Sequence, residues 1–97
     1  MNKLAKIEKK IKASKQLLSQ QYKVKKIGIF GSYALGSQKR NSDLDILVDF
    51  TETPDIFKFL RLEEYLRSLL GVRVDLTTPK ALKALIKSKI LKQAIYI

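Results

Sequence analysis

The sequence predicts a small α/β domain in which helices pack around a central β-sheet. The chain has 97 residues, the size of one domain, and its hydrophobic content of 45% is that of a folded chain. Helix-type and strand-type hydrophobic patterns alternate along it, without internal repeats or a linker. We therefore treat residues 1–97 as a single domain.

The N-terminal half is predicted to form one helix and two strands. Residues 3–21 form an amphipathic helix with lysines between its apolar positions, and residues 26–30 (KIGIF) form a short strand. Residues 43–50 (DLDILVDF) form a second strand, and their apolar centre is typical of burial on both faces. The apolar positions of the helix are Leu4, Ile7, Ile11, Leu18 and Tyr22.

A second long helix is predicted between Thr53 and Gly71. Thr53 can cap its start, Pro54 suits the first helical position, and Gly71 suits the position just past the last turn. The buried stripe of this helix is predicted to contain Phe59, Leu62, Leu66, Leu69 and Leu70.

The C-terminal part is predicted to be a strand followed by a helix. Residues 72–77 (VRVDLT) form the third strand, and Thr78 with Pro79 repeats the helix-start signal. The apolar face of this helix is predicted to be Leu82, Leu85 and Ile86, followed by a last turn or two near Ile90 and Leu91.

Composition excludes several kinds of chemistry. The chain has no cysteine and no histidine, so disulfides, thiolate metal sites and imidazole catalysis are all excluded. Catalysis would have to use carboxylates, hydroxyls and metal ions. The sequence shows neither a signal peptide nor an apolar run near 20 residues, and we therefore expect a soluble cytoplasmic protein without a membrane partner.

The net charge of +11 is concentrated at the two ends of the chain. Residues 1–26 hold nine lysines and one acid, and residues 80–97 hold five lysines and no acid. These ends could bind nucleic acid or an acidic protein, or they could be solvated helix faces. The lysines lack the interleaved aromatic residues of single-strand binders, so nucleic acid is a conceivable partner but not a required one.

Three aspartates follow the strand pattern in a way that suggests a metal site. Asp43 and Asp45 lie two residues apart, so both side chains leave the second strand on the same face. Their repulsion would be relieved by a cation, and carboxylates of this kind suit Mg²⁺. Asp75 has the equivalent place in the third strand and could be a third carboxylate. Asp49 lies about 13 Å further along the second strand and is left out of the site.

A glycine-serine pair precedes the aspartates. Gly31 ends the first strand where a backbone could approach a ligand closely, and Ser32 opens a short helical turn that favours an anion. The pair could therefore hold a phosphate beside the carboxylates. Each feature alone has an ordinary alternative: a turn, a strand-start cap, or an aspartate paired with a lysine.

Together these motifs resemble a known signature. Gly31-Ser32, ten residues, Asp43-Leu44-Asp45 and a later Asp75 are similar to the minimal (MNT) branch of the DNA polymerase beta-type nucleotidyltransferase superfamily. The resemblance covers nearly the whole chain and implies a palm-like fold, a mixed sheet flanked by helices. It also implies that Asp43 and Asp45 hold two Mg²⁺ ions, and that Asp75 helps to bind metal and to activate the attacking hydroxyl.

The implied reaction is attack of an acceptor hydroxyl on the α-phosphorus of ATP, with release of pyrophosphate. Gly31 and Ser32 would orient the triphosphate. Family members often carry arginines in the loop after Gly-Ser, where this chain has Tyr33 and Leu35. Lys39 or Arg40 could replace that charge.

The resemblance also implies a partner. The larger antibiotic-modifying and RNA-extending relatives add an acceptor domain, and this chain ends about twenty residues after Asp75. Minimal members are typically encoded with a HEPN-domain ribonuclease toxin and act as its antitoxin by adenylylating a tyrosine. Two alternatives stay open: neutralisation of a partner or binding of RNA by contact alone, and nucleotide transfer to a small molecule such as an antibiotic by a homodimer.

Overall fold

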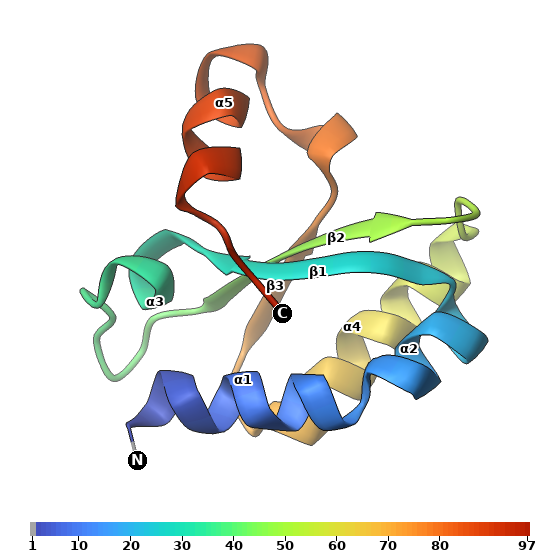
Figure 1. Ribbon diagram of the computed structural model, residues 1–97, viewed down its shortest axis with the longest axis horizontal. Helices are drawn as coiled ribbons and strands as arrows, with labels where there is room; N and C mark the ends of the chain where they lie inside the picture. Colours follow the sequence, from blue (N-terminus) through green and yellow to red (C-terminus); the bar gives the residue numbers. More distant parts are fainter. Residues whose placement is uncertain (1) are drawn as a thin grey trace.

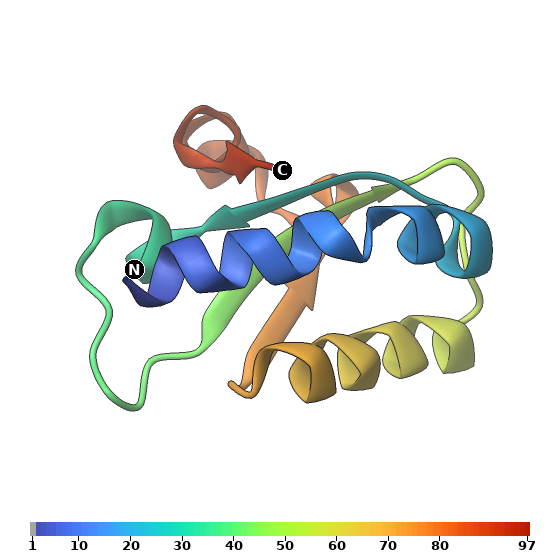
Figure 2. The same ribbon diagram turned by 60° about the horizontal axis from the view of Figure 1, so that its bottom comes forward.

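The computed structural model describes residues 2–97 and contains a four-stranded sheet with helices on both sides (Figure 1). Helices α1, α2 and α4 cover one face, and α5 with the single turn before it lies above the opposite face; Figure 2 shows the same division after rotation. In chain order the elements are α1 (Lys3–Ala13), α2 (Lys15–Tyr22), β1 (Val24–Phe30), α3 (Gly31–Leu35), β2 (Leu44–Phe50), α4 (Ile56–Leu70), β3 (Val74–Thr77), the 3₁₀ helix η1 (Pro79–Ala81), α5 (Ala84–Gln93) and β4 (Ile95–Tyr96).

The sheet is mixed and has the order β3-β2-β1-β4. Strand β1 runs antiparallel to both β2 and β4, and β2 runs parallel to β3. The predicted α/β class with a mixed sheet flanked by helices is therefore confirmed. The three predicted strands are present, with starts shifted to Val24, Leu44 and Val74.

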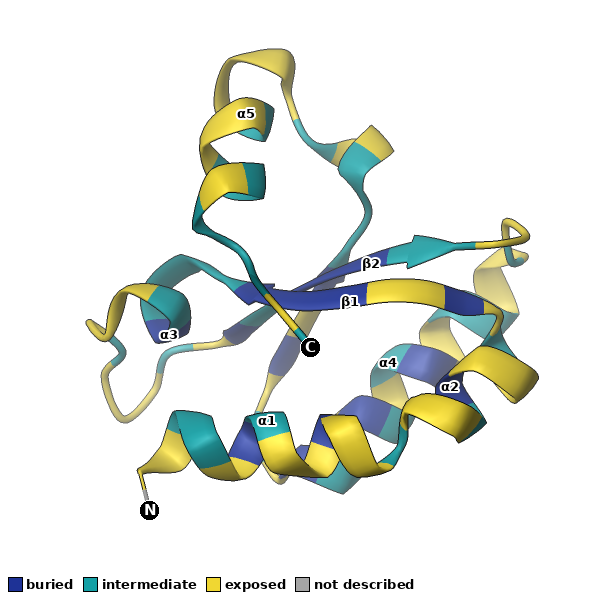
Figure 3. Ribbon diagram, viewed as in Figure 1, coloured by how far each residue is buried: buried dark blue, intermediate teal, exposed yellow. Residues whose placement is uncertain are grey.

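The core lies between the sheet and the helices α1, α2 and α4 (Figure 3). Alternate residues of β2 point into it, because successive side chains of a strand point to opposite faces. Leu47 is also buried although it points to the other face, so the expected burial of β2 on both faces is confirmed at its centre. The core residues of the helices are Ile7, Ile11, Leu18, Leu62, Leu66 and Leu70, and those of the strands include Ile27, Ile29, Leu44, Ile46, Val48, Val74 and Leu76.

The prediction of one helix over residues 3–21 was wrong, because the chain breaks at Ser14 into α1 and α2. Ser14 leaves helical geometry, and its hydroxyl accepts a hydrogen bond of 3.2 Å from the Tyr65 hydroxyl on α4. The corner lets both short helices keep apolar side chains on the sheet. The hydrophobic period does not reveal the break, because Ile11 and Leu18 are two full turns apart.

The start of α4 also differs from the prediction. Asp55, rather than Thr53, is the N-cap, and its carboxylate accepts a 2.8 Å hydrogen bond from the backbone N–H of Lys58. The first helical residue is Ile56 instead of Pro54. The predicted end at Gly71 is confirmed, with φ of +67°.

The helix expected after Thr78 and Pro79 forms only the single turn η1, and α5 begins at Ala84. The predicted apolar face of this helix was also wrong, because Leu85 is 97% exposed. The chain then returns as β4, which pairs with the edge of β1 and has too few residues for a strand pattern. Within residues 2–97, none of the helices is long and apolar enough to cross a membrane.

Candidate active site

Asp45 and Asp75 lie side by side on adjacent strands. They are paired in the parallel register of β2 and β3. Their strand neighbours Leu44, Ile46 and Val74 are buried against the helices, so both carboxylates leave on the opposite face of the sheet. The sheet therefore brings together two residues that are thirty positions apart in the sequence.

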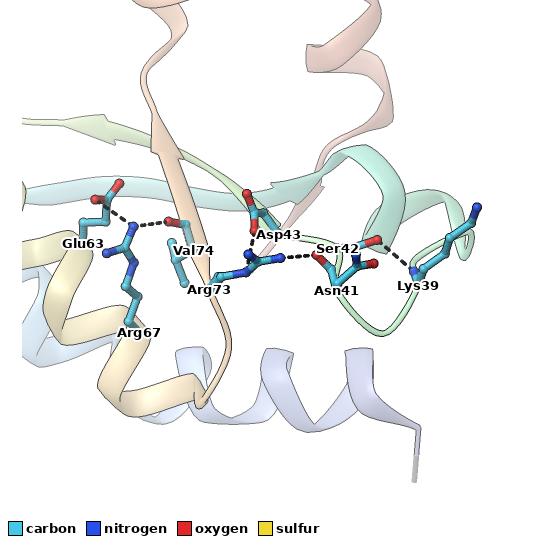
Figure 4. Close-up of polar contacts among 8 residues, drawn as sticks. All are labelled: Lys39, Asn41, Ser42, Asp43, Glu63, Arg67, Arg73 and Val74. Atoms are coloured by element: carbon cyan, nitrogen blue, oxygen red, sulfur yellow. Dashed lines mark hydrogen bonds and ion pairs between the residues drawn. The ribbon is translucent and has the colours of Figure 1, made fainter.

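Asp43 lies just before β2, and its side chain is held by the residue that precedes β3. Its carboxylate forms an ion pair with Arg73, with Nε and Oδ1 3.0 Å apart (Figure 4). The same guanidinium donates a hydrogen bond to the backbone carbonyl of Asn41. Arg73 thus ties the end of the loop before β2 to the start of β3.

The pKa of Asp45 is raised above its ordinary value. Partial burial is the main cause, followed by the negative charges of Asp75 and then Asp43. The charges of Asp75 and Asp43 therefore act on Asp45, and a cation bound near it would relieve the repulsion.

The carboxylates suit a divalent cation in chemistry, although they do not form a finished site. Among residues 2–97, no three acidic side chains lie close enough together to hold a metal ion. One oxygen of Asp43 is engaged by Arg73, and Asp45 with Asp75 is the pair that the sheet holds in register. Oxygen donors of this kind are those that Mg²⁺ accepts together with water and phosphate oxygens.

Gly31 lies directly against Asp45. Its φ is +70°, a conformation that favours glycine, and a Cβ built there would overlap the Asp45 carboxylate and lie 3.1 Å from its Cγ. Phe30, the preceding residue, is the register partner of Asp45. The backbone at the start of α3, where Ser32 lies, is therefore next to the carboxylates.

Tyr33 and Leu35, which stand where family members often carry arginines, have different surroundings. Tyr33 is fully buried in the core, whereas Leu35 is exposed. The ammonium of Lys3 lies 5.9 Å from the centre of the Tyr33 ring. Lys39 and Arg40 are exposed, and the Lys39 side chain points away from Asp43 (Figure 4).

Comparison with known proteins decides the family. The nucleotidyltransferase domain family matches residues 5–97. The chain belongs to this family. It is 47% identical over 94 residues to the protein adenylyltransferase MntA of Thermococcus cleftensis, covering 97% of this chain and 95% of that protein.

Two solved structures support the same assignment. A minimal nucleotidyltransferase superposes with a TM-score of 0.82 at 33% identity, covering 95% of this chain and 93% of the other. A chain of a toxin-antitoxin complex with AMP-PNP has a TM-score of 0.71 at 32% identity, covering 90% and 70%. The resemblance to the minimal nucleotidyltransferases is therefore confirmed, and the chain is an enzyme of this class.

Arg73 of this nucleotidyltransferase is not among the site residues predicted from the sequence. The only available signal was its place in VRVD, two residues before Asp75. That spacing predicts a shared strand face with Asp75, but it gives no reason to expect contact with Asp43. The contact depends on the parallel pairing of β2 and β3, which brings their first residues together.

Proposed function

We propose that this nucleotidyltransferase is a protein adenylyltransferase, which transfers AMP from ATP to a hydroxyl of a partner protein. The observation that carries the proposal is the convergence on Asp45, with the Gly31 backbone on one side and Asp75 on the other. The proposed phosphate-binding turn then lies against one carboxylate and beside the strand that carries the other, an arrangement that suits phosphoryl transfer. The name of the 47% identical relative supports the same activity.

Each residue has a distinct role in the proposed reaction. The Gly31 backbone and the Ser32 hydroxyl orient the triphosphate of ATP. The acceptor oxygen bonds to the α-phosphorus, the bond to the bridging oxygen breaks, pyrophosphate leaves, and the exposed Asp75 accepts the hydroxyl proton. Asp43, Asp45 and Asp75 would hold two Mg²⁺ ions once Asp43 leaves Arg73 and the phosphates supply further oxygens, and the bound ions would neutralise charge on the phosphates.

We infer that the acceptor is a tyrosine of a HEPN-domain toxin and that the transfer makes this chain its antitoxin. The support is the family resemblance together with the solved relative that forms a toxin-antitoxin complex with AMP-PNP. The open face around Asp75 also suits an acceptor supplied by another protein, because this aspartate is exposed.

The test is incubation of the purified HEPN-domain partner with this chain, ATP and Mg²⁺, followed by intact mass and peptide mapping. We expect the partner to gain one or more AMP units on a tyrosine, and to gain none with Asp45→Asn or with EDTA. An unchanged partner mass with the wild-type chain would contradict the proposal.

Neutralisation by contact is the second candidate, because all nine lysines of residues 1–26 are exposed. It predicts that Asp45→Asn still silences the partner without changing its mass. Transfer of AMP to an antibiotic without any partner protein would instead favour the hypothesis that the chain is a small-molecule nucleotidyltransferase.

A further inference from the structure

A largely apolar pocket of about 800 Å³ lies where the sheet meets α4, η1 and α5. Its walls include Phe59 and Ile56 of α4, Leu76 at the end of β3, and Pro79 of η1. Lys87 of α5 closes it from the other side. Lys87 is the residue that α5 contributes to the lining, and the helix itself stands nearer to α3 (Figure 1).

One wall of the pocket lies on the same face of the sheet as the candidate active site. Thr77 and Asp49 line it, and they follow Asp75 and Asp45 on the same strands by two and four residues. Because these spacings are even, the side chains leave on the same face of the sheet. At the usual rise, the pocket starts about 7 Å from Asp75 and about 13 Å from Asp45 along the strands.

Exposed apolar side chains continue the pocket wall onto α4. Ile56 is 62% exposed, and its neighbours Phe57 and Leu60 are 72% and 51% exposed. Side chains of this size in one patch mark an interaction surface more often than a freely solvated one. The apolar strip is thus continuous with the pocket through Ile56.

The charges around the pocket favour an acidic occupant. Lys80 and Lys87 line it against the single carboxylate of Asp49. Residues 80–97, which form η1, α5 and β4, contain five lysines and no acid. An occupant that combines apolar and acidic side chains would match both features.

We propose that this pocket and the strip Ile56, Phe57 and Leu60 dock an apolar and acidic segment of the partner protein, which holds the acceptor hydroxyl near Asp75. This inference rests on the proposed transfer to a protein. A nucleotide base is a poorer occupant, because it would leave the strip on α4 uncovered and has no acidic group to meet Lys80 and Lys87.

The test uses the full chain and the purified HEPN-domain partner, with Lys87→Glu and Ile56→Ser as variants. We expect Lys87→Glu to raise the KM for the partner about tenfold, because like charges would then face each other. The kcat at saturating partner and the affinity for AMP-PNP, measured by calorimetry, should stay unchanged. Lys89→Glu is the matched control, because Lys89 is exposed on the same helix but does not line the pocket.

The outcomes separate this inference from the proposed function. If the wild-type chain modifies the partner and both variants keep its KM, the docking site is wrong and the transferase function stands. If Lys87→Glu weakens AMP-PNP binding instead, the pocket holds the nucleotide and the inference is overturned. If the wild-type chain leaves the partner unmodified, the docking site and the proposed transferase function are both wrong. Circular dichroism and thermal unfolding verify that each variant is folded.

Discussion

Asp45 is the residue at which the candidate site converges. It lies against the Gly31 backbone and is the register partner of Asp75 on the neighbouring strand. Partial burial and, after it, the negative charges of Asp75 and Asp43 raise the pKa of Asp45. Because Asp45 is partly buried, its own negative charge is unfavourable in the folded protein when no cation is bound. Function and stability should therefore oppose each other at this position.

For Asp45→Asn we expect loss of AMP transfer and a higher free energy of unfolding at pH 7 without divalent cations. Because the folded pKa of Asp45 is raised, the folded state binds this proton more tightly than the unfolded state does. As the pH rises through the folded pKa, Asp45 loses this proton, and the wild-type chain loses the stability that the tighter proton binding gave. The gain from Asp45→Asn should disappear below about pH 4, where the carboxyl is protonated in both states. Urea unfolding at several pH values gives the free energy of unfolding of both chains. A lower value for Asp45→Asn than for the wild type at pH 7 would contradict the prediction.

For Gly31→Ala we expect a larger loss of stability than for Gly71→Ala. Both glycines have a similar positive φ, +70° and +67°, so each variant should lose about 1 kcal/mol through backbone strain. Only the Gly31 Cβ meets Asp45, whereas nothing lies within 4 Å of a Cβ at Gly71. Urea unfolding measures this difference, and equal losses would mean that Asp45 moves aside at no cost.

The same substitution should weaken nucleotide binding. We expect Gly31→Ala to lower the affinity for AMP-PNP with Mg²⁺ more than Ser32→Ala does, since the latter removes one hydrogen bond worth about 0.5–1.5 kcal/mol. Gly71→Ala should leave the affinity unchanged. Calorimetry gives these affinities, and identical values for all variants would show that the turn does not contact the phosphates.

At the scale of elements, β3 is an edge strand whose outer backbone groups are covered by side chains of α4. Arg67 donates a 3.1 Å hydrogen bond to the carbonyl of Val74, and Glu63 accepts a 3.3 Å hydrogen bond from the N–H of Leu76 (Figure 4 draws the first). Arg67 and Glu63 also form an ion pair one helical turn apart, at 3.3 Å. The pair blocks the addition of another strand at this edge, beside Asp75.

For Glu63→Ala we expect a loss of about 0.5–1.5 kcal/mol of stability and faster hydrogen exchange at the Leu76 amide, which loses its acceptor. Glu64→Ala is the control, because Glu64 is the adjacent, exposed residue of the same helix. Amide exchange followed by NMR separates the two variants. Equal protection of Leu76 in both would show that Glu63 does not hold this edge.

At the scale of the whole molecule, the net charge of +11 is displayed on the surface. The lysines of residues 1–26 are all exposed, as are four of the five lysines of residues 80–97. Exposed charges of one sign attract an acidic partner over distances limited by the Debye length, about 8 Å at physiological ionic strength.

We expect association with the HEPN-domain partner to slow and weaken as salt concentration rises. The salt dependence should be smaller after charge reversal at Lys87 than at Lys89, if the pocket rather than α5 as a whole receives the acidic segment. Surface plasmon resonance at several salt concentrations gives both rate constants. Binding that is equally tight at low and high salt would show that the lysines take no part.

Features that depend on neighbouring residues could be predicted from the sequence. The apolar run of β2 predicted burial on both faces at its centre, and the helical period predicted the stripe of α4 that contains Leu62 and Leu66. The part of the family signature from Gly31-Ser32 to Asp43-Leu44-Asp45 was readable for the same reason, because its spacings are short. Cap choices were less certain, since Thr53 and Asp55 both suit an N-cap and only the folded chain selects Asp55.

Tertiary structure alone decided the contacts between segments distant in the sequence. Ser14 at the corner meets Tyr65 of α4, β4 exists because it pairs with β1, and Arg73 reaches Asp43 because β3 lies parallel to β2. The approach of Gly31 to Asp45 and the pocket between α4, η1 and Lys87 have the same origin. A hydrophobic period reports which side of its own element a residue occupies, and it carries no information about which other element will face that side.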